Sequence, residues 1–238
     1  MNVENYLKDN DLIINLKKGK TEYMLVGTSK KLNNVPSEFK LLFHFAEINR
    51  THCYKYLGSI VDSKLSLTEN FCSVYKKASS RLRLLSALKP QIDDSTATTI
   101  YNTMITPLIT FNSIINMNFT TTQLKKLTSL DRRASNITRN TELPNLRDKI
   151  LRNGCLIVRK CVDKNVCYNF LEYFKTVNHD RTTRNNHHMI QIPKVRLNVA
   201  KNGFFYMGAL TYNKLPLSAR KERSFVKFKD FLKTFSFY

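Results

Sequence analysis

The hydrophobic period of the chain changes at Ser66, and this change constrains the fold more than any other feature. Before it, residues 41–62 are rich in aromatic and β-branched side chains, and the run over 53–61 alternates as in an extended strand. After it, apolar residues recur every three or four positions and form one helical stripe: Phe71, Val74, Tyr75, Ala78, Leu82 and Leu85. The sequence therefore predicts strands that lead into an amphipathic helix over 67–88.

Local signals mark both ends of this helix. Ser66 or Thr68 is the expected N-cap, and Glu69 stands three residues after Ser66, as in a capping box. At the other end, Lys89 precedes Pro90, and a residue before proline disfavours helical backbone. We therefore expect the helix to stop at this pair.

Similar patterns predict helices through most of the remaining chain. A second helix runs from Asp94 or Ser95 to about Ile115, with a kink at Pro107. A third covers 121–137, and the segment 145–175 forms one or two more, with a break near 163–165. Residues 176–202 are polar and irregular. The end of the chain has an aromatic run, a Leu-Pro break and an amphipathic helix that carries Phe225, Phe228, Phe231 and Leu232.

The predicted fold class is therefore α+β with helix predominating, and the strands lie mostly within 12–62. Only 6 glycines and 6 prolines occur in 238 residues, which argues against a glycine-rich sandwich or a doubly wound sheet. We predict three parts: short strands over 1–62, a helical unit over 63–140, and a helical and extended C-terminal region over 141–238.

The triplet Gly19-Lys20-Thr21 matches the end of the nucleotide-binding P-loop, G-x-x-x-x-G-K-[ST]. However, Ile14 stands where the loop needs its first glycine to wrap backbone N–H groups around phosphates. The residues after Thr21 indicate a strand, whereas a P-loop needs a helix there to bind the phosphate. We therefore interpret the segment as a hairpin, with a strand over 12–16, a basic turn over 17–20 and a strand over 22–26.

The chain is strongly basic, with 39 Lys and Arg against 18 Asp and Glu and a formal net charge of +21. Such an excess favours a partner with a phosphate backbone. An anionic membrane surface is the main competing partner, and a basic surface without any partner is the third interpretation. We predict nucleic acid as the partner, held by backbone contacts, and no membrane.

Neither a secretory signal nor a membrane span is visible in the sequence. The first five residues have no apolar signal region. The most apolar stretch, 104–115, is short and is interrupted by threonine, proline, asparagine and serine, so it does not span a bilayer. The expected location is intracellular, either nuclear or cytoplasmic.

Four basic side chains flank the predicted helix over 67–88. Lys76 and Arg83 are seven residues apart on one flank, and Lys77 and Arg81 are four apart on the other. A single run of this kind is usually a solvated surface. Because the whole chain is basic, contact with nucleic acid is the competing interpretation, and we predict these four residues as nucleic-acid-binding.

No pattern in the sequence predicts a metal or another cofactor. The five cysteines are widely spaced, odd in number and without a C-x-x-C pair, which excludes both a disulfide framework and the common zinc spacing: Cys53, Cys72, Cys155, Cys161 and Cys167. We expect them to be reduced, partly buried thiols. His187 and His188 have no carboxylate or cysteine near them in the sequence.

Three motifs occur in order along the chain: LIINLKKGKTEYMLVGTSKKL at 12–32, YKYLGSIVDSKLSLTENFCSVYKKASSRLRLLSAL at 54–88, and YNKLPLSARKERSFVKFKDFLKTF at 212–235. Together they resemble the C-terminal part of reverse transcriptases from LINE-like retrotransposons, which lack long terminal repeats. The resemblance spans nearly the whole chain. It implies the end of a palm over 1–62, a thumb-like unit over 63–140 and the family's C-terminal region.

The resemblance also implies roles for particular positions. In that family an L-x-x-N-x-x-K-T-like segment closes the palm, a K-Y-L-G strand begins the thumb region, and W/Y-N-x-L-P lies near the C-terminus. The matching residues are Asn15, Lys20 and Thr21, then Lys55, Tyr56, Leu57 and Gly58, then Tyr212, Asn213, Leu215 and Pro216. The lysine of the first segment is implicated near the incoming nucleotide. This implies a nucleic-acid contact for Lys20 and its neighbours Lys17 and Lys18.

The metal-binding aspartates of that family are not found in this chain. They hold two divalent metals for phosphoryl transfer, and they come from an early palm aspartate and an aromatic-x-Asp-Asp turn, both upstream of the N-x-x-K-T segment. The only Asp-Asp pair here, Asp93-Asp94, follows that segment and lacks the aromatic residue, and Asp94-Ser95 fits a helix cap. We therefore predict no catalytic residue.

Three hypotheses about function remain open at this point. The first is a truncated protein, derived from a reverse transcriptase, that binds nucleic acid without catalysis of its own. The second is a fragment of an active RNA-directed DNA polymerase whose aspartates lie on another chain or on upstream sequence. The third is a relic without function. The choice between RNA and DNA and the oligomeric state are also left open.

Overall fold

The computed structural model describes residues 3–17, 19–43, 45–112, 114–115, 117, 119–163, 170, 172–177 and 188–237. The chain divides into two units, Met1–Asn70 (unit 1) and Phe71–Tyr238 (unit 2). Helix predominates, and every strand in the described part belongs to unit 1. The predicted fold class, α+β with helix predominating, is confirmed. The finer predicted division at residue 140 stays a prediction.

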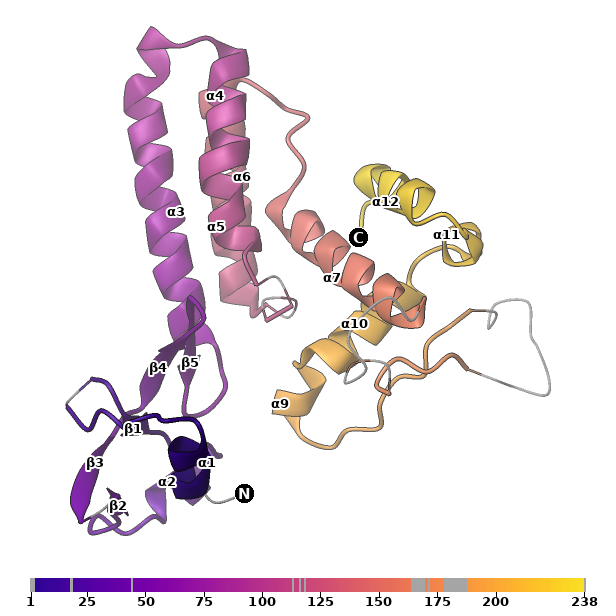
Figure 1. The fold of residues 1–238 in the computed structure, drawn as a ribbon. Helices are drawn as coiled ribbons and strands as arrows, with labels where there is room; N and C mark the ends of the chain where they lie inside the picture. Colours follow the sequence, from indigo (N-terminus) through magenta and orange to yellow (C-terminus); the bar gives the residue numbers. More distant parts are fainter. Residues whose placement is uncertain are drawn as a thin grey trace. The chain divides into compact units, whose positions relative to one another are not determined.

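Unit 1 contains two small sheets (Figure 1). In the first, β1 (Glu22–Tyr23) pairs in parallel with β3 (Ala46–Arg50), which pairs antiparallel with β2 (Leu41–Phe43). In the second, β4 (Cys53–Tyr56) and β5 (Ser59–Asp62) form an antiparallel hairpin. Two short helices complete the unit, α1 (Val3–Asp9) and α2 (Ser29–Asn33).

The predicted hairpin over 12–26 is wrong, although its turn is present. Residues 12–16 form no strand, and β1 pairs with a distant strand, with Glu22 opposite Asn49. The Lys20 N–H donates to the Lys17 carbonyl at 3.0 Å, and Gly19 has a φ of +79°, which favours glycine. Pairing with β3 therefore prevails over the local alternation of the sequence.

The run over 53–61 was predicted to be extended, and it forms two strands with a turn between them, the β4–β5 hairpin. Its turn is Leu57-Gly58, and both residues have positive φ, +45° and +86°. Two-residue hairpin turns favour this backbone because it matches the twist of the flanking strands. Glycine adopts it readily, but leucine rarely does, so the sequence gives little sign of a turn here. The K-Y-L-G motif is thus the end of a strand and a turn.

Helix α3 (Thr68–Leu88) confirms the helix predicted over 67–88, but its start is organised differently. The Asp62 carboxylate accepts hydrogen bonds from the N–H groups of Lys64, Ser66 and Leu67. The predicted capping box is wrong, because the Ser66 N–H donates to Asp62 and not to Glu69. Burial alone would raise the pKa of Asp62, but these hydrogen bonds lower it below its ordinary value.

The helix predicted from residue 94 to about 115 is shorter and divided in three. A 3-10 turn, η1 (Lys89–Gln91), follows α3; then come α4 (Asp94–Ile100), a π-helical segment η2 (Tyr101–Ile105), and α5 (Thr106–Thr110). Pro107 lies in the first turn of α5. Proline has no N–H to donate inside a helix, so one backbone hydrogen bond is missing there. The wider π turn immediately before Pro107 accommodates the missing bond.

Helices α6 (Thr121–Thr138), α7 (Leu146–Val162) and α12 (Phe225–Thr234) lie close to their predicted positions. Helix α9 (Asn198–Lys201) lies within the segment 176–202, so the prediction that this segment is irregular is wrong for these residues. Helices α10 (Phe204–Asn213) and α11 (Leu217–Lys221) lie on either side of the Leu-Pro break and were not predicted individually. Helix α6 begins with a capping box made by Thr120 and Gln123. The break predicted near residue 163 is confirmed by the end of α7.

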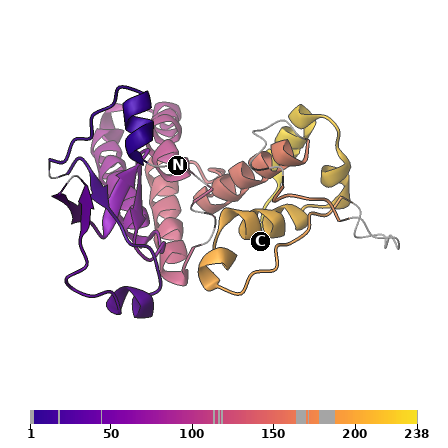
Figure 2. The ribbon, with the colours of Figure 1, turned by 60° about the horizontal axis from the view of Figure 1, so that its bottom comes forward.

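The core of unit 2 is built around α7 and the helices that pack on it. Both views show α7 lying against α10 (Figures 1 and 2), and a Cβ added to Gly208 of α10 would lie 3.0 Å from Val158 of α7. The apolar stripe predicted for α3 is mostly buried, with Ala78, Leu82 and Leu85 at most 1% exposed. Helix amphipathicity therefore predicted the buried faces correctly.

Candidate nucleic-acid interface

The positive charge is concentrated in unit 2. Of the 39 basic and 18 acidic residues, 29 and 10 belong to Phe71–Tyr238, which gives this unit a net charge of +19. The other 10 basic and 8 acidic residues belong to Met1–Asn70, which is left with +2. A surface that attracts phosphates is therefore expected on unit 2.

The acidic side chains of unit 2 are largely engaged within the fold. Several of them cap helices or bind neighbouring basic residues: Asp93 caps α4, Asp131 accepts from the first residue of α7, and Asp94, Asp163 and Asp230 pair with Lys89, Arg159 and Lys233. Most basic side chains of unit 2 consequently have no acidic partner among the described residues. Their charge is available to an outside partner.

The four predicted residues of α3 are all exposed, but they are not equivalent. Lys76, Lys77 and Arg83 form no ion pair or side-chain hydrogen bond with any described residue. Arg81 instead donates to the carbonyl of Met104 in the π-helical segment, at 2.7 Å. Arg81 therefore connects α3 to η2, and any contact that it makes with a phosphate uses its remaining donors.

One basic residue beside α3 was not singled out from the sequence. The ammonium group of Lys126 on α6 lies 5.7 Å from the ring centre of Tyr75 on α3, within the range of a cation–π contact. This places a positive charge of α6 beside the basic helix. The two residues are 51 positions apart, so no local pattern could indicate their contact.

Two of the three lysines predicted as contacts in unit 1 belong to the described residues. Lys17 and Lys20 are exposed on either side of the turn at Gly19, and Lys18 lies outside the described residues. The side chain of Asn15 accepts the Lys17 N–H at 3.1 Å, so it organises the turn. The low net charge of unit 1 gives this turn less support as a phosphate site than α3.

The Asp93-Asp94 pair has a structural role at the start of α4. The N-cap is Asp93, one residue before the predicted Asp94. Asp93 accepts the N–H of Thr96 at 3.2 Å and is the N-cap of α4. Asp94 lies in the first turn and pairs with Lys89. Carboxylates at these positions stabilise a helix N-terminus.

The C-terminal motif of the resemblance is mostly buried. Tyr212 and Leu215 are each 1% exposed, and the Asn213 amide both donates to and accepts from the backbone of Ile190, at 2.8 Å each. Arg220, from the same segment, is also buried and donates to the Leu215 carbonyl at 3.0 Å. These residues therefore hold the fold of unit 2 and are unavailable to nucleic acid.

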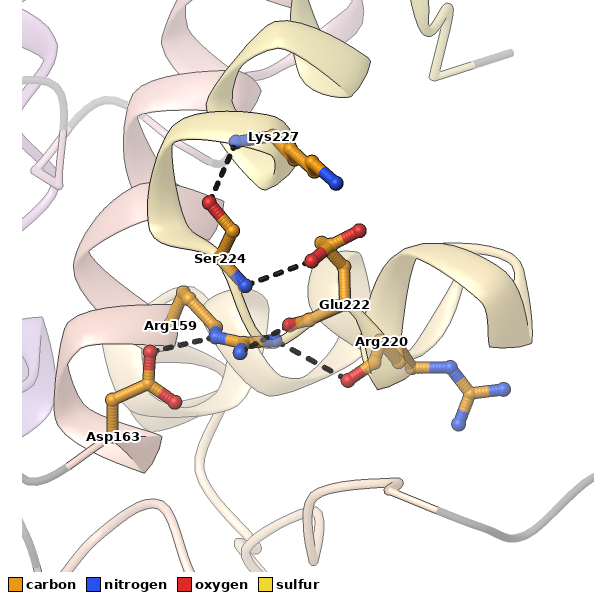
Figure 3. A network of polar contacts seen from close by, with 6 residues as sticks. All are labelled: Arg159, Asp163, Arg220, Glu222, Ser224 and Lys227. Carbon is orange, nitrogen blue, oxygen red and sulfur yellow. Dashed lines mark hydrogen bonds and ion pairs between the residues drawn. The ribbon is translucent and has the colours of Figure 1, made fainter.

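Arg159 of α7 organises this segment (Figure 3). Its guanidinium donates to the Asp163 carboxylate at 2.8 Å and to the carbonyls of Arg220 and Glu222. It also lies 5.2 Å from the ring centre of Phe228 on α12. One buried cation thus connects α7, α11 and α12. Burial would lower its pKa, but the hydrogen bond and charge of Asp163 raise it.

A second buried polar cluster joins α6, α7 and the π-helical segment. Both carboxylate oxygens of Asp131 on α6 accept the N–H of Leu146, the first residue of α7, at 3.3 Å. Lys149 of α7 donates to Asn102 at 3.1 Å, and its ammonium lies 5.6 Å from the ring centre of Tyr101. The burial of the Tyr101 hydroxyl raises its pKa.

Burial raises the pKa of Asp131 to about 6, although the Leu146 N–H and the charge of Lys149 act in the opposite direction. A carboxyl whose pKa is higher in the folded state binds protons more tightly there. It therefore stabilises the fold below its unfolded pKa of about 4, and this contribution is lost as the pH rises through 6. Tyr101, Asp148 and Lys149 are the other titratable groups that act on it.

We expect Asp131→Asn to remove this pH dependence. Between pH 4.5 and 7.5 the free energy of unfolding of the variant should rise by about 1 to 3 kcal/mol relative to the unchanged protein. Urea unfolding of both proteins at several pH values measures the difference in their free energies of unfolding. Contributions from groups common to both proteins cancel in this difference. A constant difference across the series would show that Asp131 titrates normally.

Among the residues that the structure describes, the thiols and histidines form no metal-binding group. Cys155 and Cys161 are buried, Cys53 and Cys72 are exposed, and all four are free, so the thiols are partly buried as predicted, while their reduced state stays a prediction; Cys167 and His187 lie outside the described residues. Where the structure describes the chain, no three His, Cys, Asp or Glu side chains are grouped to hold a metal ion. The same residues contain no helix long and apolar enough to cross a membrane.

In comparisons with known proteins, the chain matches no family model, no curated protein and no solved structure. The resemblance to reverse transcriptases therefore rests on the three sequence motifs alone.

Proposed function

We propose that this protein binds nucleic acid through the phosphate backbone, without reading its sequence and without catalysis of its own. One observation carries the proposal: unit 2 has a net charge of +19, while its acidic side chains are largely engaged in caps and ion pairs. Lysine and arginine side chains on such a surface displace counterions from phosphates, and this release drives binding without base specificity.

The contact residues proposed on unit 2 centre on α3. Lys76, Lys77 and Arg83 are exposed and unpaired among the described residues, Arg81 adds its free donors, and Lys126 of α6 lies beside them. Lys17 and Lys20 of unit 1 are proposed as weaker contacts, together with Lys18. A helix with basic residues on both flanks can contact two phosphates or more along one strand.

The salt dependence of binding tests this proposal on the full chain. We expect the logarithm of the association constant to fall linearly with the logarithm of salt concentration, for single-stranded and duplex oligonucleotides of unrelated sequence alike. The slope should exceed about 2, since at least three side chains are expected to contact phosphates. Fluorescence anisotropy measures both quantities. Absence of binding at 50 mM salt would contradict the proposal.

A second candidate function is a fragment that completes an RNA-directed DNA polymerase, and one observation favours it. Unit 1 exposes large apolar side chains, with Ile13 96%, Phe45 100% and Leu57 76% exposed, while Ile48 is its only buried hydrophobic residue in the described part. Exposed apolar side chains of this extent indicate a surface that another polypeptide segment covers. The motif resemblance supports a polymerase palm as that polypeptide.

Primer extension distinguishes the two candidates. We expect the isolated chain to synthesise no DNA on a primed RNA template with magnesium, because no three described His, Cys, Asp or Glu side chains are grouped to hold a metal ion. Synthesis that is lost in a variant with Asp93→Ala and Asp94→Ala would overturn the structural role given to that pair. Synthesis that appears only when a second polypeptide with palm aspartates is added would favour the polymerase fragment.

A further inference from the structure

A small cavity in unit 2 combines apolar rings, sulfur atoms and two basic side chains. Its volume is about 80 Å³, and its lining includes Met117, Phe119, Met207, Phe237, Arg147 and Lys214. They come from the α5–α6 connection, α7, α10 and the end of the chain. Because about 10 to 15 Å³ is enough to hold one water molecule, this cavity is several times larger than a site for a single water.

The apolar part of this cavity suits a flat ring. Phe119 packs edge-on against Phe71 at 6.1 Å between ring centres, and Phe237 packs edge-on against Phe235 at 5.0 Å. Both rings are therefore held in place before any ligand enters. Thioether sulfurs such as those of Met117 and Met207 make favourable contacts with aromatic rings.

The polar part of the cavity suits an anion. Arg147 is half-buried, Lys214 is exposed, and neither side chain forms an ion pair or hydrogen bond with any described residue. A guanidinium without an intramolecular partner is well suited to bind a phosphate in a bidentate manner. A nucleotide combines these two parts, because its base is joined to a phosphate through a sugar.

We infer that this cavity holds one unpaired base of a bound single strand, with its phosphate between Arg147 and Lys214. The inference rests on the proposed nucleic-acid binding and adds a site that distinguishes single strands from duplexes. Base stacking on protein side chains contributes about 1 to 3 kcal/mol per base and tolerates any base. The site thus adds affinity for unpaired strands without adding sequence specificity.

The test compares two decamers of equal charge on the full chain. One is abasic at every position, and the other carries a single thymine at its centre. We expect the thymine decamer to bind about 5- to 150-fold more tightly, as 1 to 3 kcal/mol of stacking requires. If neither decamer binds, the proposed function itself fails; if both bind equally, only the base pocket fails.

Substitutions in the cavity test whether the base binds there. Leu124→Trp places a large ring at another lining residue, and Gly154→Ala places a Cβ 2.5 Å from the Met117 side chain, which must then move. In each folded variant the preference for the thymine decamer should disappear, whereas Val226→Trp, on an exposed position of α12 that is not part of the lining, should keep it. Preference retained in both pocket variants would overturn the inference.

A double variant tests the phosphate part of the site. Changing Arg147 and Lys214 together to glutamine should weaken both decamers, with at least a fivefold larger effect than changing Lys227 and Lys229 to glutamine, two exposed lysines away from the lining. Equal effects of the two double variants would contradict a phosphate between Arg147 and Lys214.

Photocrosslinking decides the location even if the pocket variants do not fold. A decamer with 5-iodouracil in place of thymine should crosslink the unchanged protein at Phe119, Met207 or Phe237, and a crosslink at residues outside the lining would overturn the inference. Free thymidine monophosphate should displace the decamer only at millimolar concentration. Displacement at micromolar concentration would show a site for free nucleotides and contradict a strand ligand.

Discussion

Changing Lys76, Lys77 and Arg83 to glutamine is expected to weaken binding to all oligonucleotides on the order of a hundredfold at 0.1 M salt. Each lost phosphate contact lowers the slope of log K against log salt by about 0.7 for single strands and 0.9 for duplexes, so three contacts remove about 2 to 3 units. The effect should be the same for unrelated sequences, because phosphate contacts carry no base information. Anisotropy titrations between 50 and 300 mM salt measure the slope.

The fold of this variant should be unchanged, since the three side chains are exposed and the buried stripe of α3 is untouched. Arg81 is left in place because it donates to Met104 and its loss would confuse binding with stability. A matched control changes Lys30, Lys31 and Lys64 of unit 1, all exposed, to glutamine. Equal losses in both triple variants would mean that only net charge matters and that α3 is solvated surface.

Changing Arg159 to methionine is expected to lower the free energy of unfolding by about 3 to 5 kcal/mol. Methionine fills a similar volume, but it leaves the Asp163 carboxylate and the carbonyls of Arg220 and Glu222 without their donor. The Arg159 side chain is only 7% exposed, so water replaces few of these hydrogen bonds. Breaking one partner of a buried, hydrogen-bonded charge pair has costs of this size.

Lys160 is the matched control for this change. It follows Arg159 on α7, is exposed, and contacts Phe225 of α12 by a cation–π interaction at 5.6 Å. Lys160→Met should lower stability by about 1 kcal/mol or less. Urea unfolding, followed by circular dichroism, compares the two, and similar midpoints for both variants would contradict the role assigned to Arg159.

Periodic apolar patterns predicted the helical part of this protein from the sequence. The spacing of Phe71, Ala78, Leu82 and Leu85 reports which face of α3 is buried, because helical geometry repeats every 3.6 residues whatever the neighbours are. The break at Lys89-Pro90 and the end of α7 near residue 163 are equally local, and both are confirmed.

The strands were less predictable, because a strand is completed only by its partner. Glu22 and Tyr23 pair with β3 instead of with residues 12–16, and Leu57 occupies a turn position that leucine seldom takes. The predicted nucleic-acid-binding residues of α3 also combine features that local spacing predicts with a contact that depends on a distant segment. The exposure of Lys76, Lys77 and Arg83 follows from helix spacing, whereas the bond from Arg81 to Met104 needs the π-helical segment to lie beside α3.

The sequence by itself determined the predominance of helix, the buried face of α3 and the large positive charge, since each depends on composition or on local spacing. Only the tertiary structure decided where that charge is available. The division into two units gives unit 2 a net charge of +19, and folding engages its acidic residues in caps and ion pairs. Folding also buries Arg159 and Arg220, two cations that the sequence does not distinguish from their exposed neighbours. The physical reason is that burial and ion pairing depend on residues distant in the chain, such as Arg159 and Glu222, which folding alone brings together.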